Sequence, residues 1–166
     1  MKIGVDVDGV LADYHTYFIE SFNDRFGTDF TKEDWKEYYF LPRVHGYKFT
    51  KKDYWQFVQY HVDIGAWKFL TPIEGSIEAL NRLSNKNSIH IITHKLGKSR
   101  QDTIYWLEKK GIKYDSVSFT EEKSRLGVIF GLDVMIEDSL KQADAMSECG
   151  IQTLLFDQPW NRVQTG

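Results

Sequence analysis

The chain has 166 residues, with 21 basic and 24 acidic side chains and a formal net charge of −3. Its length suits one well-buried domain with a small insertion, and the lack of a long basic run excludes the electrostatic footprint of a duplex nucleic-acid binder. A single cysteine, Cys149, excludes an internal disulfide framework and favours a reducing compartment. No apolar run approaches the roughly 20 residues that span a bilayer, and residues 1–4 leave no room for a signal peptide, so we expect a cytoplasmic protein without a membrane partner.

The first predicted element is a short apolar strand that ends in two acids. An apolar stretch over residues 3–7 contains Asp6, and Asp8 and Gly9 follow it. Because glycine is the usual residue at a sharp turn, we expect a buried strand that delivers two carboxylates to its carboxyl end, where open α/β sheets bind ligands. Two acids so close repel each other unless a cation joins them, so a hard metal ion with oxygen ligands is the expected partner.

The next part of the chain, residues 14–72, is rich in aromatic side chains and contains 18 of the 25 in the sequence. Helix-like runs cover residues 16–26 and 51–62, and Thr31 with Asp34 three residues later is a helix start signal. Three aromatic residues follow at helical spacing: Trp35, Tyr38 and Tyr39. We expect most of these rings to build the core of a small helical lobe, and a minority to form the wall of a pocket.

After residue 72, strand and helix signals alternate. The β-branched runs are residues 88–93, 116–119, 134–136 and 151–156. The helical segments between them are residues 76–83, 99–110, 121–130 and 140–148. Such alternation implies parallel strands covered by helices. We therefore predict an α/β fold, with a Rossmann-like parallel-sheet core made of residues 1–13 and 73–166 and a small helical cap, residues 14–72, inserted after the first strand.

Four strand ends in this core carry side chains suited to phosphate chemistry. The segment from Asp6 to Val10 follows the first strand, and Thr93 ends the next. Lys123 begins a helix after the third strand, and Glu137 and Asp138 follow the fourth. In this order they resemble the four motifs of the haloacid dehalogenase-like hydrolase superfamily. One such motif alone is a weak signal, but four in order across the whole core are specific.

The resemblance implies a phosphatase that uses Mg²⁺. Asp6 would attack phosphorus as the nucleophile, and Asp8 would protonate the leaving oxygen and then take a proton from the water that cleaves the aspartyl-phosphate. Mg²⁺ would be held by Asp6, by Asp8 through its backbone carbonyl, and by Asp138. Glu137 would either assist through water or lie outside the metal's ligands. A carboxylate at position 8 favours the phosphatases over the dehalogenase branch.

The same resemblance implies a phosphate-binding set. Thr93 would donate its hydroxyl to a phosphate oxygen beside the backbone N–H of His94, and Lys123 would supply positive charge. The His94 and Lys95 side chains would add phosphate contacts, with the alternative, which we favour for His94, that this histidine is a polar loop residue. No nucleoside triphosphate loop, dinucleotide fingerprint or serine-hydrolase elbow is present in the sequence.

Three segments resemble 5'(3')-deoxyribonucleotidases: residues 6–14, 67–75 and 155–162. This resemblance implies a nucleoside monophosphate as the substrate, with Tyr14 and Trp67 in an aromatic wall beside the nucleobase. The pair His94-Lys95 departs from that family, which usually has a small residue and often proline after the threonine. The sequence does not decide whether the protein forms a homodimer.

Two other functions stay open. Residues 99–112 also resemble the 3'-phosphatase domains of polynucleotide repair enzymes, although those keep an open site and a 59-residue cap argues against one. The second alternative is a phosphate-binding module on the same fold that no longer turns over substrate.

Overall fold

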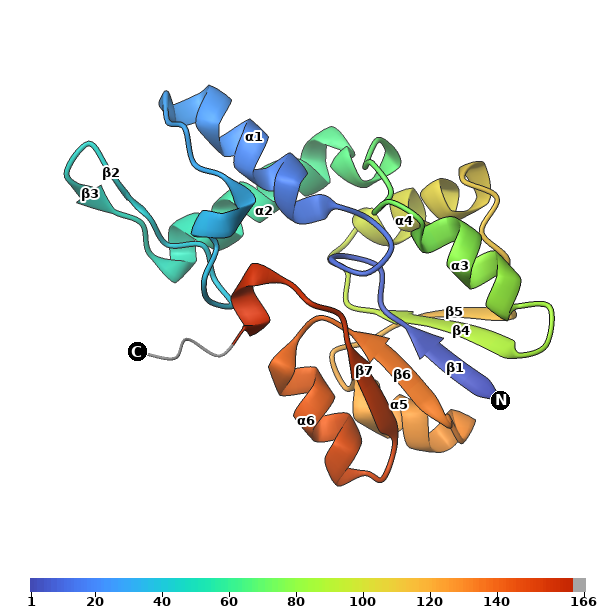
Figure 1. Cartoon of the computed structure of the whole chain (residues 1–166). Helices are drawn as coiled ribbons and strands as arrows, with labels where there is room; N and C mark the ends of the chain where they lie inside the picture. The colour runs from blue at the N-terminus through green and yellow to red at the C-terminus, as the bar shows by residue number, and fades with distance from the viewer. Residues whose placement is uncertain (163–166) are drawn as a thin grey trace.

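The computed structural model describes residues 1–162, which are built around a five-stranded parallel sheet of order β5-β4-β1-β6-β7 (Figure 1). The strands are β1 (Lys2–Val5), β4 (Ser88–Thr93), β5 (Ser116–Phe119), β6 (Val134–Glu137) and β7 (Gln152–Leu155). Four helices cover them: α3 (Ser76–Leu83), α4 (Ser99–Lys109), α5 (Lys123–Phe130) and α6 (Leu140–Glu148). Figure 1 shows α3 and α4 on one face of the sheet and α5 and α6 on the other. The predicted α/β fold with a parallel sheet is confirmed.

The central strands are apolar along most of their length because helices bury both faces of the sheet. In β4, Ile89, Ile91 and Ile92 are fully buried, and in β1 the side chains of Ile3 and Val5 are also in the core. The bounds of the four strands after residue 72 differ from the predicted ones by no more than one residue at either end, whereas β1 ends at Val5, two residues before the end of the predicted apolar stretch.

The strand order places a topological switch point beside β1. From β1 the chain forms β4 and β5 in one direction, and then crosses back to form β6 and β7 on the other side. Strand β1 pairs with β4 and β6 in parallel, so the carboxyl ends of all three strands lie at one edge of the sheet. This is where open α/β sheets bind their ligands.

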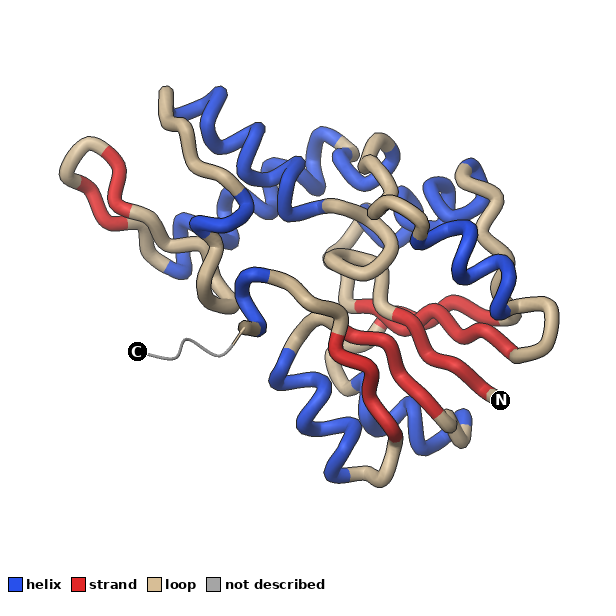
Figure 2. The backbone as a smooth tube through the Cα atoms, viewed as in Figure 1, coloured by secondary structure: helices blue, strands red, loops and turns tan. Residues whose placement is uncertain are grey.

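Residues 14–72, which we predicted to form a cap and call the cap below, lie beyond that edge (Figure 1). The cap contains α1 (Tyr14–Phe26), η1 (Lys32–Asp34), a hairpin of β2 (Arg43–Val44) and β3 (Tyr47–Lys48), α2 (Lys51–Ile64) and η2 (Ala66–Lys68). Figure 2 shows the hairpin projecting at the end of the cap that is far from the sheet. Edge-to-face aromatic pairs fill the cap core, as predicted for most of the rings. Phe18 of α1, for example, lies 5.0 Å from Trp35 and 4.9 Å from Phe57 of α2, measured between ring centroids.

The predicted helix after Thr31 is wrong beyond its first turn. Thr31 and Asp34 do form a capping box, but the helical turn they start ends at Asp34. Trp35 and Phe40 are both buried in the cap core, and two residues five positions apart cannot share one face of an α-helix. Burial of these two rings therefore outweighs the local helix signal. The short hairpin that follows was also not predicted.

Three helix bounds differ from prediction by two residues. Helix α1 begins at Tyr14 and not at residue 16, α2 continues to Ile64, and α5 begins at Lys123 and not at residue 121. Within residues 1–162, none of the helices has the length and apolar character needed to cross a membrane.

Candidate active site

Side chains from β1, α5 and β6 meet at the carboxyl edge of the sheet. The Lys123 ammonium lies 2.8 Å from Asp6 Oδ2 and 2.7 Å from Glu137 Oε2, so it bridges the two carboxylates. One carboxylate oxygen from each of Asp6, Glu137 and Asp138 lies within 4.8 Å of the other two. All four side chains are buried. The structure thus brings together four of the predicted motif residues, and it makes Glu137 the second partner of the lysine.

Neighbouring positive charges balance the carboxylates of this cluster to different degrees. Burial alone would raise the pKa of Asp6, but the ammonium groups of Lys123 and Lys95 hold that pKa below its ordinary value. Burial and the charges of Asp6 and Glu137 raise the pKa of Asp138 well above its ordinary value. Asp6 is therefore held in its ionised form, whereas for Asp138 the positive charge of Lys123 does not offset burial and the two neighbouring carboxylates. A buried set of carboxylate oxygens with this deficit suits a hard divalent cation.

Asp8 faces a different set of partners. Its carboxylate accepts a hydrogen bond from the Lys95 ammonium and a bifurcated one from the indole N–H of Trp67, whose Nε1 lies 3.1 and 3.2 Å from the two oxygens. Burial raises the pKa of Asp8 above its ordinary value, although Lys95 acts in the opposite direction. The pKa values of the two acids of the first motif thus differ in direction: Asp6 is held ionised, and Asp8 is protonated more readily than a free aspartate.

The turn after β1 requires glycine at position 9. Gly9 has φ of +78°, a left-handed conformation that L-residues with a side chain avoid. A Cβ at this position would also collide with the Asp138 carboxylate. The side-chain amide of Gln158 donates to the Gly9 carbonyl at 2.6 Å. The backbone therefore passes directly against Asp138, and this close approach places Asp8 beside the acidic cluster.

Thr93 and His94 lie at the end of β4, next to the first-motif acids. Thr93 is buried, and its Oγ1 accepts a hydrogen bond from the Lys95 ammonium at 3.4 Å. The His94 ring turns toward the start of α5, where Nε2 lies 3.1 Å from Glu121 Oε1. The Thr93 hydroxyl is thus near Asp8, whereas the His94 side chain is engaged at the rim.

Tyr14 and Trp67 stack on each other with ring centroids 4.6 Å apart and an interplanar angle of 20°. Their exposed fractions are 5% and 4%, and the Tyr14 hydroxyl hydrogen-bonds to His61 Nδ1 at 3.0 Å. Neither ring presents an open face. Trp67 meets the site through its polar N–H edge, and the aromatic wall beside a nucleobase stays a prediction. The rings are buried because each fills the space beside the other in the cap core.

Lys95 is the strongest feature whose role the sequence left open. It is only 2% exposed, and its ammonium donates hydrogen bonds to Asp8 and Thr93. Trp160 was noted in the sequence only as part of a family-like tail, yet its indole N–H donates to Asp138 Oδ2 at 3.0 Å. A lysine two positions after a strand-end threonine is the one local signal that could have pointed to Lys95.

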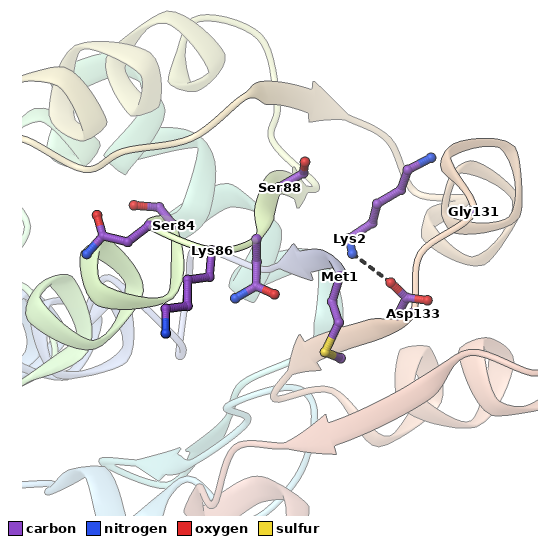
Figure 3. Close-up of a pocket in the computed structure, with 9 residues that line it drawn as sticks. Met1, Lys2, Ser84, Lys86, Ser88, Gly131 and Asp133 are labelled. Carbon is purple, nitrogen blue, oxygen red and sulfur yellow. Dashed lines mark hydrogen bonds between the residues drawn. The ribbon is translucent and has the colours of Figure 1, made fainter.

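A separate hollow of about 640 Å³ lies at the opposite edge of the sheet, at the amino ends of β1 and β4 (Figure 3). Its lining is mostly polar, and in it the backbone N–H of Lys2 donates to Asp133 Oδ2 at 2.7 Å. None of the motif carboxylates lines it. The acidic cluster therefore lies away from this hollow, beneath the cap.

A family model described as "5' nucleotidase, deoxy (Pyrimidine), cytosolic type C protein" matches residues 1–166. The chain belongs to this nucleotidase family. A nucleotidase of Clostridium acetobutylicum is 28% identical over 165 residues, which cover 98% of this chain and 83% of that protein. A protein of Chlorobaculum tepidum, named as a candidate 5'(3')-deoxyribonucleotidase, is 26% identical over 181 residues, covering 96% of this chain and 80% of the relative.

A haloacid dehalogenase family enzyme of Bacteroides thetaiotaomicron, solved with magnesium and inorganic phosphate, has the same fold with a TM-score of 0.52. It is 14% identical, and the match covers 99% of this chain and 96% of that one. This nucleotidase thus shares its fold with haloacid dehalogenase-like enzymes, and the resemblance noted in its sequence is confirmed.

Proposed function

We propose that this nucleotidase hydrolyses the phosphate ester of a (deoxy)nucleoside monophosphate through a covalent phospho-Asp6 intermediate. The observation that carries the proposal is the position of Asp6. This carboxylate is held ionised by Lys123 at the carboxyl end of the central strand, while Asp8 two residues later has a raised pKa. An ionised nucleophile beside a proton donor is what in-line phosphoryl transfer to a carboxylate requires.

In this proposal, Mg²⁺ is held by the carboxylates of Asp6 and Asp138 and by the backbone carbonyl of Asp8. The buried acidic cluster, with its raised Asp138 pKa, is the observation in this chain that fits such an ion. When bound, Mg²⁺ neutralises charge between the Asp6 carboxylate and the anionic phosphate. The magnesium in the B. thetaiotaomicron structure is consistent with this assignment.

The proposed reaction has two steps. An oxygen of Asp6 forms a bond to phosphorus as the bond to the nucleoside oxygen breaks, and Asp8 gives its proton to that oxygen. Water then attacks the phosphorus of phospho-Asp6, Asp8 accepts a proton from it, and inorganic phosphate leaves. Lys123 and the Thr93 hydroxyl bind the phosphate oxygens, with Lys95 close enough to share one of them with Thr93.

The cap favours a small substrate over a strand end, because the cap residue Trp67 contacts Asp8 directly. The segment that resembles polynucleotide 3'-phosphatases is α4 with the turn after it. The residues of α4 that are buried include Ser99, Asp102, Thr103 and Trp106. We attribute that resemblance to packing against the sheet. The family description as cytosolic supports a cytoplasmic location.

The decisive experiment is a phosphate-release screen with Mg²⁺ over 5'- and 3'-(deoxy)nucleoside monophosphates, sugar phosphates and a 3'-phosphorylated oligonucleotide. We expect the highest kcat/KM with a nucleoside monophosphate. A preference for the oligonucleotide would replace the proposal by a polynucleotide 3'-phosphatase. Absence of release from every monoester would favour a phosphate-binding module that does not turn over.

Replacing Trp67 by Phe tests the assignment of Asp8 as proton donor. The substitution keeps the ring stacked on Tyr14 but removes the N–H that stabilises the ionised Asp8 carboxylate. Its loss raises the pKa of Asp8 further, so the alkaline limb of the kcat/KM profile, where a proton donor is lost, should move to higher pH. We expect kcat to fall about tenfold, the equivalent of one hydrogen bond to a charged group. An alkaline limb at the same pH in wild type and variant would contradict the assignment.

A further inference from the structure

The segment after β7 returns across the carboxyl edge of the sheet toward the cap (Figure 1). It ends in the short helix η3 (Pro159–Asn161). From this segment, Asn161 Nδ2 donates to the backbone carbonyl of Asp138 at 2.8 Å, and the Trp160 indole N–H donates to Asp138 Oδ2 at 3.0 Å. Asp138 is therefore held at its backbone and at its carboxylate by two consecutive residues.

The Trp160 ring also contacts the cap. It stacks on His15 of α1, with centroids 3.7 Å apart and an interplanar angle of 24°, and it lies 6.0 Å from the ring of Trp35. The Lys32 ammonium lies 5.6 Å from the centroid of the same ring. One edge of Trp160 thus meets the acidic cluster while its face meets the cap. The exposed ion pair between Arg162 and Glu33 joins the same two parts, but a pair in solvent contributes little.

His15 acts in this contact as a flat, uncharged ring. The residue is partly buried, and this burial lowers its pKa to about 3. Its Nδ1 atom is fully buried and, within residues 1–162, has no hydrogen-bond partner. A ring that leaves a buried nitrogen without a hydrogen bond but keeps a close stack is held for its packing and not for proton transfer.

We propose that Trp160 is a positioning residue for Asp138 and that His15 links its position to that of the cap. The indole N–H fixes the carboxylate orientation in which the other oxygen of Asp138 can face Asp6, and the stack on His15 keeps the indole in place. Closure of the cap and binding of Mg²⁺ then favour each other. If a closed cap raises the affinity for Mg²⁺, bound Mg²⁺ must stabilise the closed cap to the same extent. This inference rests on the proposed function, because it takes Asp138 to be a Mg²⁺ ligand.

The test measures Mg²⁺ binding by calorimetry in the absence of substrate. Trp160→Phe keeps an aromatic ring against His15 but removes the N–H, and we expect the Kd for Mg²⁺ to rise at least about tenfold. The matched control is Trp55→Phe, which makes the same change at a partly exposed position on α2 and should leave the Kd unchanged. A wild-type Kd in Trp160→Phe would overturn the inference while leaving the proposed function intact.

His15 provides an independent pair of variants. His15→Ala removes the stack and should raise the Kd for Mg²⁺ and increase amide hydrogen exchange in α1, whereas His15→Phe retains a stacked ring and should do neither. Equal Kd values in all His15 variants and in wild type would overturn the link to the cap. A wild-type protein that binds no Mg²⁺ would overturn the metal assignment in the proposed function, and this inference with it.

Discussion

Asp6→Asn is expected to abolish phosphate release, with a loss of more than about a thousandfold in kcat. Asparagine has the same shape as aspartate, and its amide oxygen can still accept a hydrogen bond from Lys123, so the fold should persist. What the variant lacks is the charged oxygen that attacks phosphorus. In wild type that oxygen is ionised, because Lys123 and Lys95 hold the pKa of Asp6 below its ordinary value despite burial.

The measurement is steady-state phosphate release from the preferred nucleotide with saturating Mg²⁺, together with acid-quench trapping of labelled phosphoprotein. Phosphoprotein should form in wild type and be absent from Asp6→Asn. Asp144→Asn makes the same chemical change at an exposed position on α6 and should release phosphate like wild type. Near-native turnover by Asp6→Asn would show that another group attacks phosphorus.

Lys123→Met should lose both activity and stability. The ammonium is 4% exposed and pairs with Asp6 and Glu137 at 2.8 and 2.7 Å, so its removal leaves two buried carboxylates without their cation. Breaking a buried ion pair on one side costs about 3–5 kcal/mol of unfolding free energy. Activity should fall at least about a hundredfold, because positive charge at the phosphate is lost and the pKa of Asp6 rises without it.

Urea unfolding and kcat measured on the same samples separate the two effects. The double variant Lys123→Met with Glu137→Gln removes one of the stranded charges and should recover part of the lost stability, but none of the activity. Lys141→Met, at an exposed position on α6, is the matched single control and should resemble wild type in both measurements. If Lys123→Met unfolded like wild type, or if the double variant regained activity, the bridging role of Lys123 would be wrong.

The alternating second half of the sequence was sufficient to predict the sheet and the edge at which the candidate site lies. Strand β4 is an apolar run that ends at Thr93, and β6 ends at Glu137 directly before Asp138. Because parallel strands present their carboxyl ends at one edge, side chains that follow such runs must gather there. The local sequence pattern predicts these strands, because a strand that is buried on both faces consists of consecutive apolar residues.

The aromatic cap was less predictable. Its composition correctly indicated a core of rings, but not which rings would be buried or how the chain would run between the two long helices. The capping box at Thr31 started only a single turn, because Trp35 and Phe40 had to reach the same core from positions five residues apart. Buried aromatic residues such as Tyr14 and Trp67 have the same local sequence signal as an open stacking surface. Only the tertiary structure shows that these two rings are buried against each other.

By itself the sequence determined the fold class and predicted candidate residues at four strand ends, because each is specified by neighbours within a few positions along the chain. The tertiary structure alone decided which partner each acid has. Lys95 pairs with Asp8 across 87 positions, and Trp160 with Asp138 across 22. Such contacts form when distant segments are brought to one edge of the sheet. They produce no periodic pattern in the sequence. They nevertheless give the three aspartates different properties: Asp6 is held ionised, Asp8 has a raised pKa, and Asp138 is held in place by the C-terminal segment.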